Sequence, residues 1–173
     1  MLLPALPPTL RTPVFIVLHI PRMHPSLLVE LFAPRCRRPV READDKTVIE
    51  AGTVYFAPPD YHLLVDAGPL LALSADEPEH YSRPSIDVLF ESAADVYATR
   101  LLGIILTGAS QDGAAGLAAV RRAGGVTVVQ RPDDAQVPFM TQAALQQGAP
   151  DMVLTLSEIA DLLAELGADR SRT

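Results

Sequence analysis

The chain reads LLGIILTGASQDGAAGLAAVRRAGGVTVV from Leu101 to Val129, and this stretch points to one class of fold. Its first six residues form a continuous apolar run, which predicts a buried strand. A glycine-rich loop follows, and Ala114–Ala123 then has the apolar spacing of a helix that ends at Gly124-Gly125. Val126–Val129 is β-branched and predicts the next strand. Strand, helix and strand in this order are typical of a parallel sheet with right-handed crossovers.

The same alternation continues on both sides of this stretch. Val14–Leu18 predicts another buried strand, and Ser85 is expected to cap a helix that runs to Tyr97. The region 40–73 differs, because its short apolar runs are joined by tight turns and predict an antiparallel excursion. The other predicted elements are helices at 25–32, 141–147 and 157–166 and a strand at Met152–Leu154. The sequence therefore predicts an α/β fold: a doubly wound, mostly parallel sheet with helices on both faces, Rossmann-like and three-layered, with one antiparallel hairpin excursion.

Composition narrows the class of protein. A chain of 173 residues suits a single domain over 1–173, and an apolar fraction of 49% with only 5% aromatics predicts an aliphatic core. A net charge of −7 disfavours binding to nucleic acid or to anionic lipid. The single Cys36 and the lack of zinc-type spacing predict a reducing compartment, the cytoplasm, with no metal and no cofactor. Met1–Pro8 is apolar but has no basic region and is interrupted by prolines, so we expect neither a signal peptide nor a membrane helix.

Two polar residues follow predicted buried strands. His19 comes directly after Val14–Leu18, and Asp112 lies in the loop after Leu101–Leu106. Ligands of open α/β sheets bind beyond the carboxyl ends of the strands, where both side chains meet if the strands are neighbours. A carboxylate that holds one ring nitrogen of a histidine leaves the other nitrogen as a general base. The pair is a candidate for hydrolytic chemistry, and a solvated or backbone-bonded histidine is the simpler alternative.

The loop 107–116 carries glycines where a strand turns sharply into a helix. Free backbone N–H groups at such a turn suit an oxyanion or a phosphate, although the loop lacks the lysine of a P-loop and is otherwise a tight turn. Ser110 is a conceivable nucleophile, but its surroundings read G-x-S-x-x-G and not the G-x-S-x-G of hydrolase elbows. Arg83 precedes Pro84 at a helix entrance, where its cation could hold a substrate carboxylate or serve only as a surface charge.

Four stretches carry a resemblance by their order and spacing. They are VLHIP at 17–21, GTVYFAPPDYHL at 52–63, RPSIDVLF at 83–90, and GIILTG at 103–108 followed by DGA at 112–114. Together they resemble the catalytic domain of chemotaxis protein-glutamate methylesterases, the CheB type, and the similarity runs from about residue 6 to residue 163. The resemblance implies a doubly wound α/β domain that hydrolyses glutamyl methyl esters on chemoreceptors, and that in some members deamidates receptor glutamines.

The family uses a serine, a histidine and an aspartate. The resemblance places its histidine on His19, its aspartate on Asp112, and its oxyanion-binding loop around Gly108 and Ala109. Its serine lies in a G-x-S-x-G-G loop after the first strand, and this chain is expected to start inside the helix that follows that loop. We therefore expect a single catalytic domain over 1–173 that lacks the first strand, the nucleophile loop and the receiver domain. The segments 109–111 and 137–141 also depart from the family pattern, which leaves the substrate open.

Three hypotheses follow. The first is a methylesterase whose partners are methyl-accepting chemoreceptors and a receiver domain or another signalling regulator. The second is an inactive truncated homologue that binds a receptor or a regulator without turnover. The third is an esterase in which Ser110 replaces the missing serine.

Overall fold

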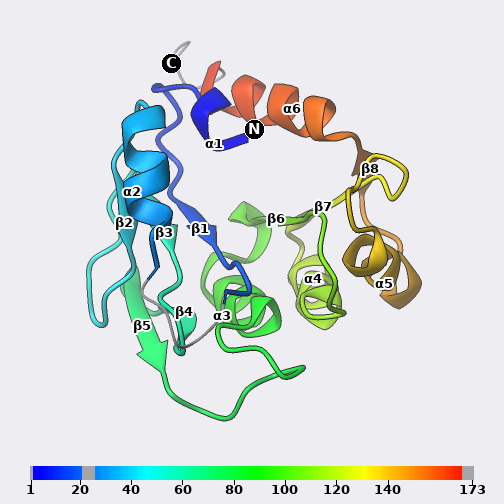
Figure 1. Ribbon diagram of the computed structural model, residues 1–173, viewed down its shortest axis with the longest axis horizontal. Helices are drawn as coiled ribbons and strands as arrows, with labels where there is room; N and C mark the ends of the chain where they lie inside the picture. The colour runs from blue at the N-terminus through cyan, green and yellow to red at the C-terminus, as the bar shows by residue number, and fades with distance from the viewer. Residues whose placement is uncertain (1, 21–25, 169–173) are drawn as a thin grey trace.

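The structure is a computed structural model that describes residues 2–20 and 26–168. It has three layers, with a sheet between two groups of helices (Figure 1). One face carries α1 (Leu2–Ala5), α2 (Leu28–Phe32) and α6 (Leu156–Ala168), and the other carries α3 (Ile86–Tyr97), α4 (Ala114–Arg122) and α5 (Phe139–Gln147). The predicted α/β class and its three layers are confirmed. The predicted start of the second helix, at residue 25, lies outside the described residues.

The central layer consists of two parallel three-stranded sheets. The first has the order β1 (Val14–Ile16), β3 (Val54–Phe56), β2 (Val40–Glu42), and the second has the order β6 (Leu102–Ile105), β7 (Val126–Gln130), β8 (Met152–Leu154). Within the described residues, β1 and β6 pair on one side only, and their unpaired edges face the middle of the molecule (Figure 1).

The antiparallel excursion is smaller than predicted. It consists of β4 (His62–Asp66) and β5 (Leu70–Ser74), which pair in register from His62 with Ser74 to Asp66 with Leu70, and of a single antiparallel bridge between Val48 and Leu70. β3 was expected to belong to it, but β3 lies parallel between β1 and β2. The reason is burial: all three side chains of β3 are buried, as is typical of a strand covered on both faces.

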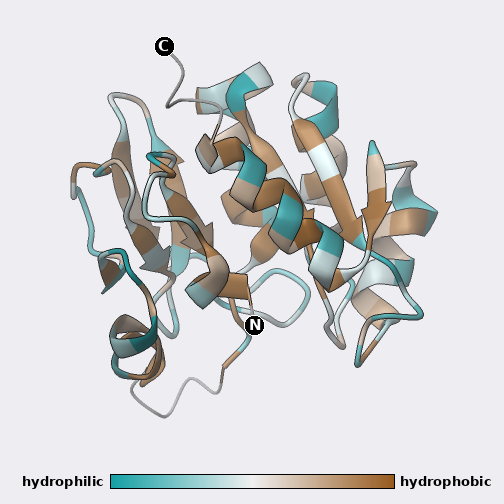
Figure 2. Ribbon diagram, turned by 90° about the horizontal axis from the view of Figure 1, so that it is seen from above, coloured by the Kyte–Doolittle hydropathy of each residue, from teal (hydrophilic) through white to brown (hydrophobic). Residues whose placement is uncertain are grey.

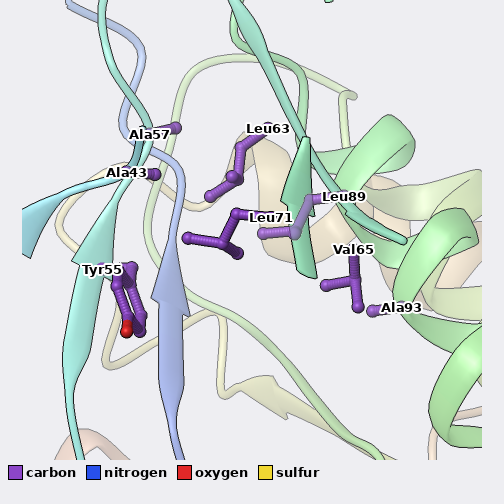
Figure 3. Packing of buried hydrophobic residues seen from close by; sticks show 8 residues of the cluster. All are labelled: Ala43, Tyr55, Ala57, Leu63, Val65, Leu71, Leu89 and Ala93. Carbon is purple, nitrogen blue, oxygen red and sulfur yellow. The ribbon is translucent and has the colours of Figure 1, made fainter. Parts of the chain in front are cut away.

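One apolar cluster joins β3, the β4–β5 hairpin and α3 (Figure 3). Its members are Ala43, Tyr55, Ala57, Leu63, Val65, Leu71, Leu89 and Ala93. Figure 2 shows the same distribution over the molecule, with brown strands inside and teal residues on the outer faces of the helices. Because the cluster fixes α3 against the hairpin, it also fixes the N-terminus of α3, from which most of the site described below is built.

Two glycines allow α3 and the loop before α4 to approach each other. Gly113 has a φ of +96°, and a Cβ atom there would lie 2.5 Å from Ile105 Cδ1. A Cβ atom on Gly116 would lie 2.8 Å from the backbone Cα of Asp87. No side chain fits at either position, so these glycines bring Asp112 next to the start of α3.

Candidate active site

His19 and Asp112 lie together at the carboxyl edge of the sheet. His19 follows β1 and Asp112 follows β6, and His19 Nε2 is 2.7 Å from Asp112 Oδ2. The His19 side chain is 26% exposed, whereas the Asp112 side chain is fully buried at 0%. The two side chains therefore meet at one edge, as their positions after two strands suggested, although β1 and β6 do not pair with each other in the described residues. His19 is open to a reactant, and Asp112 is shielded from water.

Asp112 is surrounded by hydrogen-bond donors from the start of α3. Its Oδ1 accepts from Ser85 Oγ at 2.7 Å and from the Asp87 N–H at 3.1 Å, and its Oδ2 accepts from the Ile86 N–H at 2.7 Å. Burial by itself raises the pKa of Asp112, but the hydrogen bonds from His19 and from the start of α3 outweigh it and lower the pKa below its usual value. The carboxylate is therefore ionised, and the His19 Nε2–H donates to it. This leaves His19 Nδ1 as the nitrogen that can accept a proton.

A second histidine–carboxylate pair lies beside the first. Asp87, in the first turn of α3, accepts the Gly116 N–H at 2.5 Å on Oδ1 and has His80 Nε2 at 3.3 Å from Oδ2. The other ring nitrogen of His80 is 3.1 Å from Gln111 Nε2, so His80 links α3 to the residue before Asp112. Burial raises the pKa of Asp87, the Gly116 N–H opposes that rise, and the nearby charge of Asp112 adds to it.

The sequence did not reveal this second pair. His80 lies in an acidic loop with no partner nearby in the chain, and Asp87 in a first helical turn is explained by the helix dipole alone. His62 also had no evident partner, but its ring is buried and bridges two segments. Its Nδ1 accepts the Ser85 N–H at 3.1 Å, and its Nε2 donates to the Glu77 carbonyl at 3.1 Å. Ser85 itself caps α3 as predicted, since its side chain accepts from the Val88 N–H.

The loop after β6 differs from the prediction at Gly108. The Gly108 N–H donates to the Val137 carbonyl at 3.0 Å, and the Gly108 carbonyl accepts from the Met140 N–H at 2.9 Å. The Gly108 N–H is therefore occupied and not free to hold an oxyanion in this structure. Among the described residues, the Ala109 N–H has no hydrogen-bond partner. Ser110 Oγ accepts the Asp112 N–H at 3.1 Å, which stabilises the turn.

Arg83 has internal partners that its sequence position did not predict. Its Nε and Nη2 donate to Asp60 Oδ1, and its Nη1 donates to the carbonyls of Ala75 and Asp76 at 2.6 and 2.8 Å. These bonds hold the loop between β5 and α3. A role of Arg83 in substrate binding stays a prediction.

A histidine held by an ionised carboxylate at the carboxyl edge of a parallel α/β sheet is an arrangement suited to general-base chemistry, and comparisons with known proteins place it in a family of carboxylic ester hydrolases. The chain matches the family model for CheB methylesterase over residues 1–163, and it belongs to that family. The crystal structure of the Thermotoga maritima CheB methylesterase catalytic domain superimposes with a TM-score of 0.90 at 28% identity, over 95% of this chain and 89% of that one.

Sequence relatives agree with this membership. A Leptospira interrogans protein is 41% identical over 165 residues, which is 95% of this chain and 86% of that protein. Relatives from Trichodesmium erythraeum and Symbiobacterium thermophilum, 36% and 38% identical, are named protein-glutamate methylesterase/protein-glutamine glutaminase. The chain spans about half of these two relatives, 46% and 45% of their lengths. In the described part of the chain, no helix has the length and apolar character needed to cross a bilayer.

Proposed function

We propose that this domain hydrolyses glutamyl methyl esters on methyl-accepting chemoreceptors in the cytoplasm, with receptor glutamine deamidation as a second reaction. The observation that carries the proposal is the 2.7 Å hydrogen bond between His19 Nε2 and the ionised Asp112, in a chain with the CheB fold. The names of the relatives support the choice of substrate.

The geometry supports a definite role for each group. His19 Nδ1 takes the proton of a serine hydroxyl as the serine oxygen attacks the ester carbonyl, and Asp112 stabilises the imidazolium that forms. The Ala109 N–H is the proposed donor to the oxyanion. The imidazolium then protonates the departing methoxide, which leaves as methanol. Water deprotonated by His19 hydrolyses the acyl-enzyme and releases the glutamate carboxylate.

The serine is proposed to come from outside these 173 residues. The stretch contains no G-x-S-x-G-G motif. The unpaired edges of β1 and β6 support the insertion of a further parallel strand between them, because each edge offers backbone groups that have no strand partner among the described residues. A serine after that strand would lie at the same edge as His19.

Ser110 is the weaker candidate for the nucleophile. Its hydroxyl oxygen accepts the Asp112 N–H, and no described contact joins it to His19. An inactive homologue that only binds a receptor or a regulator is the remaining alternative.

Exposed apolar side chains around the site support a protein substrate. Leu18 precedes His19, and Val137 and Phe139 flank the loop of Gly108; these three residues are 43%, 42% and 54% exposed. Tyr81, in the loop of His80, is 99% exposed. Large apolar and aromatic side chains at such a rim are suited to bind a helical receptor segment. A receiver domain or another regulator is a further proposed partner.

The test compares methanol release from methylated receptor by the 173-residue chain, by a version extended upstream of Met1, and by the extended version with His19→Gln. We expect release only from the extended protein with His19 intact. Fluorophosphonate labelling with peptide mapping then identifies the nucleophile. An extended protein that carries G-x-S-x-G-G and releases no methanol would contradict the esterase proposal, and a labelled Ser110 would identify the third hypothesis as correct.

A further inference from the structure

A cavity lies at the other end of the first sheet, away from His19. It has a volume of about 490 Å³ and is lined by Arg11, Arg37 and Arg38 together with residues such as Pro39 and Gly52. Arg11, Pro39 and Gly52 shortly precede β1, β2 and β3, so the cavity lies at the amino ends of these parallel strands. Its volume is within the range of small-molecule sites.

Arg38 is a buried cation without a full set of acceptors. The residue is 6% exposed, and its Nε donates to the Gly52 carbonyl at 2.8 Å. Its Nη2 donates to the carbonyls of Leu10 and Thr12. The third nitrogen, Nη1, is buried and has no hydrogen-bond partner in the described part of the chain. A buried donor left in this state indicates a missing acceptor such as an ion or a water molecule.

In the described part of the chain, no carboxylate forms an ion pair with Arg38. Burial lowers the pKa of the Arg38 guanidinium, and in the described part of the chain the opposing effect comes from the Cys36 thiol and not from a carboxylate. Arg11 and Arg37 are exposed, and no ion pair involves either of them in residues 2–20 and 26–168. Three other arginines do pair with carboxylates: Arg41, Arg83 and Arg131. Among the described residues that line the cavity, none is acidic.

We propose that this cavity binds a small molecule through a phosphate group held by Arg11, Arg37 and Arg38. Guanidinium groups bind phosphate oxygens with paired, charge-assisted hydrogen bonds, and a phosphate brings more negative charge than a carboxylate to three cations. The chain has a net charge of −7, so a cavity whose described lining holds three arginines and no carboxylate departs from its overall charge. This site is separate from the ester chemistry and does not depend on it.

The decisive variant is Arg11→Ala with Arg37→Ala, because both side chains are exposed and their removal leaves the three carbonyl contacts of Arg38 intact. Arg38→Ala is unsuitable as the sole test, since its guanidinium also joins three segments of backbone. Arg35→Ala is the matched control: Arg35 is exposed and two residues from Arg37, but it does not line the cavity.

Isothermal titration calorimetry of the folded chain at constant ionic strength uses inorganic phosphate, ribose 5-phosphate and acetate as probes. We expect saturable binding of phosphate, weakened by about tenfold or more in the double variant and unchanged in Arg35→Ala. Tighter binding of ribose 5-phosphate indicates a phosphomonoester ligand, and equal binding indicates free phosphate. The proposal is overturned if phosphate shows no saturable binding, if the double variant binds as well as the wild type, or if acetate binds equally well.

Discussion

Asp112 and Asp87 are two buried carboxylates in the same hydrogen-bond network, and their pKa values shift in opposite directions. Asp112 accepts from His19, from the Ser85 hydroxyl and from two backbone N–H groups, and its pKa is lowered. Asp87 accepts the Gly116 N–H on one oxygen, its other oxygen has His80 Nε2 at the longer distance of 3.3 Å, and its pKa is raised. Burial acts on both groups in the same sense. The difference shows that the supply of hydrogen-bond donors, and not burial alone, decides the direction in which each pKa shifts.

Asp112→Asn is expected to produce the largest effect. In the enzyme that carries the serine, an amide at this position has no charge with which to hold the His19 Nε2–H, so Nδ1 is no longer kept free to act as the base. The comparable substitution in a serine protease lowers kcat roughly 10⁴-fold. Steady-state methanol release, with circular dichroism as the check on folding, measures it. A folded Asp112→Asn enzyme that keeps more than a tenth of the wild-type kcat would remove Asp112 from the proposed mechanism.

Gly113→Ala tests the backbone that places both carboxylates. Gly113 needs a positive φ and has no room for a Cβ atom, so we expect a loss of about 2–4 kcal/mol in the free energy of unfolding. Gly68 is the matched control, because its φ is +88° but no atom lies within 4 Å of an added Cβ. Gly68→Ala should therefore cost only about 1 kcal/mol, the cost of the left-handed conformation. Urea unfolding of the two variants measures the difference, and equal losses would show that the close packing at Gly113 contributes nothing.

Asp87→Asn is expected to change stability much less than Asp112→Asn does. The substitution removes a buried charge whose second oxygen has only His80 near it, and the remaining amide oxygen can still accept the Gly116 N–H. We expect a change within about 1 kcal/mol in the free energy of unfolding at neutral pH. Parallel chemical denaturation of the two variants gives the comparison. A larger loss from Asp87→Asn than from Asp112→Asn would reverse our account of the two carboxylates.

The smallest expected effect is on the pH dependence of stability, to which Asp112 and Asp87 should contribute in opposite directions. The lowered pKa of Asp112 contributes stability above the ordinary value of 3.8, and this contribution is lost as pH falls through the lowered folded value. The raised pKa of Asp87 works in the opposite sense, since the folded state prefers its protonated form and loses that advantage as pH rises through the raised value. The charges facing Asp87 are those of His80 and Asp112.

The measurement is the free energy of unfolding of the wild type and of Asp87→Asn from pH 3 to pH 7. We expect the variant to gain stability relative to the wild type as pH rises, because only the folded wild type bears the free-energy cost of ionising the buried Asp87 carboxyl group. A constant difference over the whole range would show that the environment of Asp87 does not shift its pKa.

The local elements followed from the sequence closely. The strand at Met152–Leu154 and the helix after Ser85 were predicted within a residue, because apolar periodicity and capping are properties of neighbouring positions. The positions of His19 and Asp112 after predicted parallel strands also placed both residues at one edge, since parallel strands end at the same edge; their direct contact was expected only for neighbouring strands, and β1 and β6 do not pair in the described residues. The prediction for β3 was wrong, because turn residues on either side of a strand do not reveal which strand lies next to it.

The sequence by itself determined the α/β class, the elements, the family resemblance and the candidate pair of His19 and Asp112. Only the tertiary structure decided which nitrogen of His19 faces Asp112, that the Gly108 N–H is occupied, that His80 pairs with Asp87, and that Arg38 Nη1 has no acceptor among the described residues. The physical reason is distance along the chain. A helix or strand is set by residues a few positions apart, whereas a hydrogen bond such as His19 to Asp112 joins positions 93 residues apart and exists only after packing has brought them together.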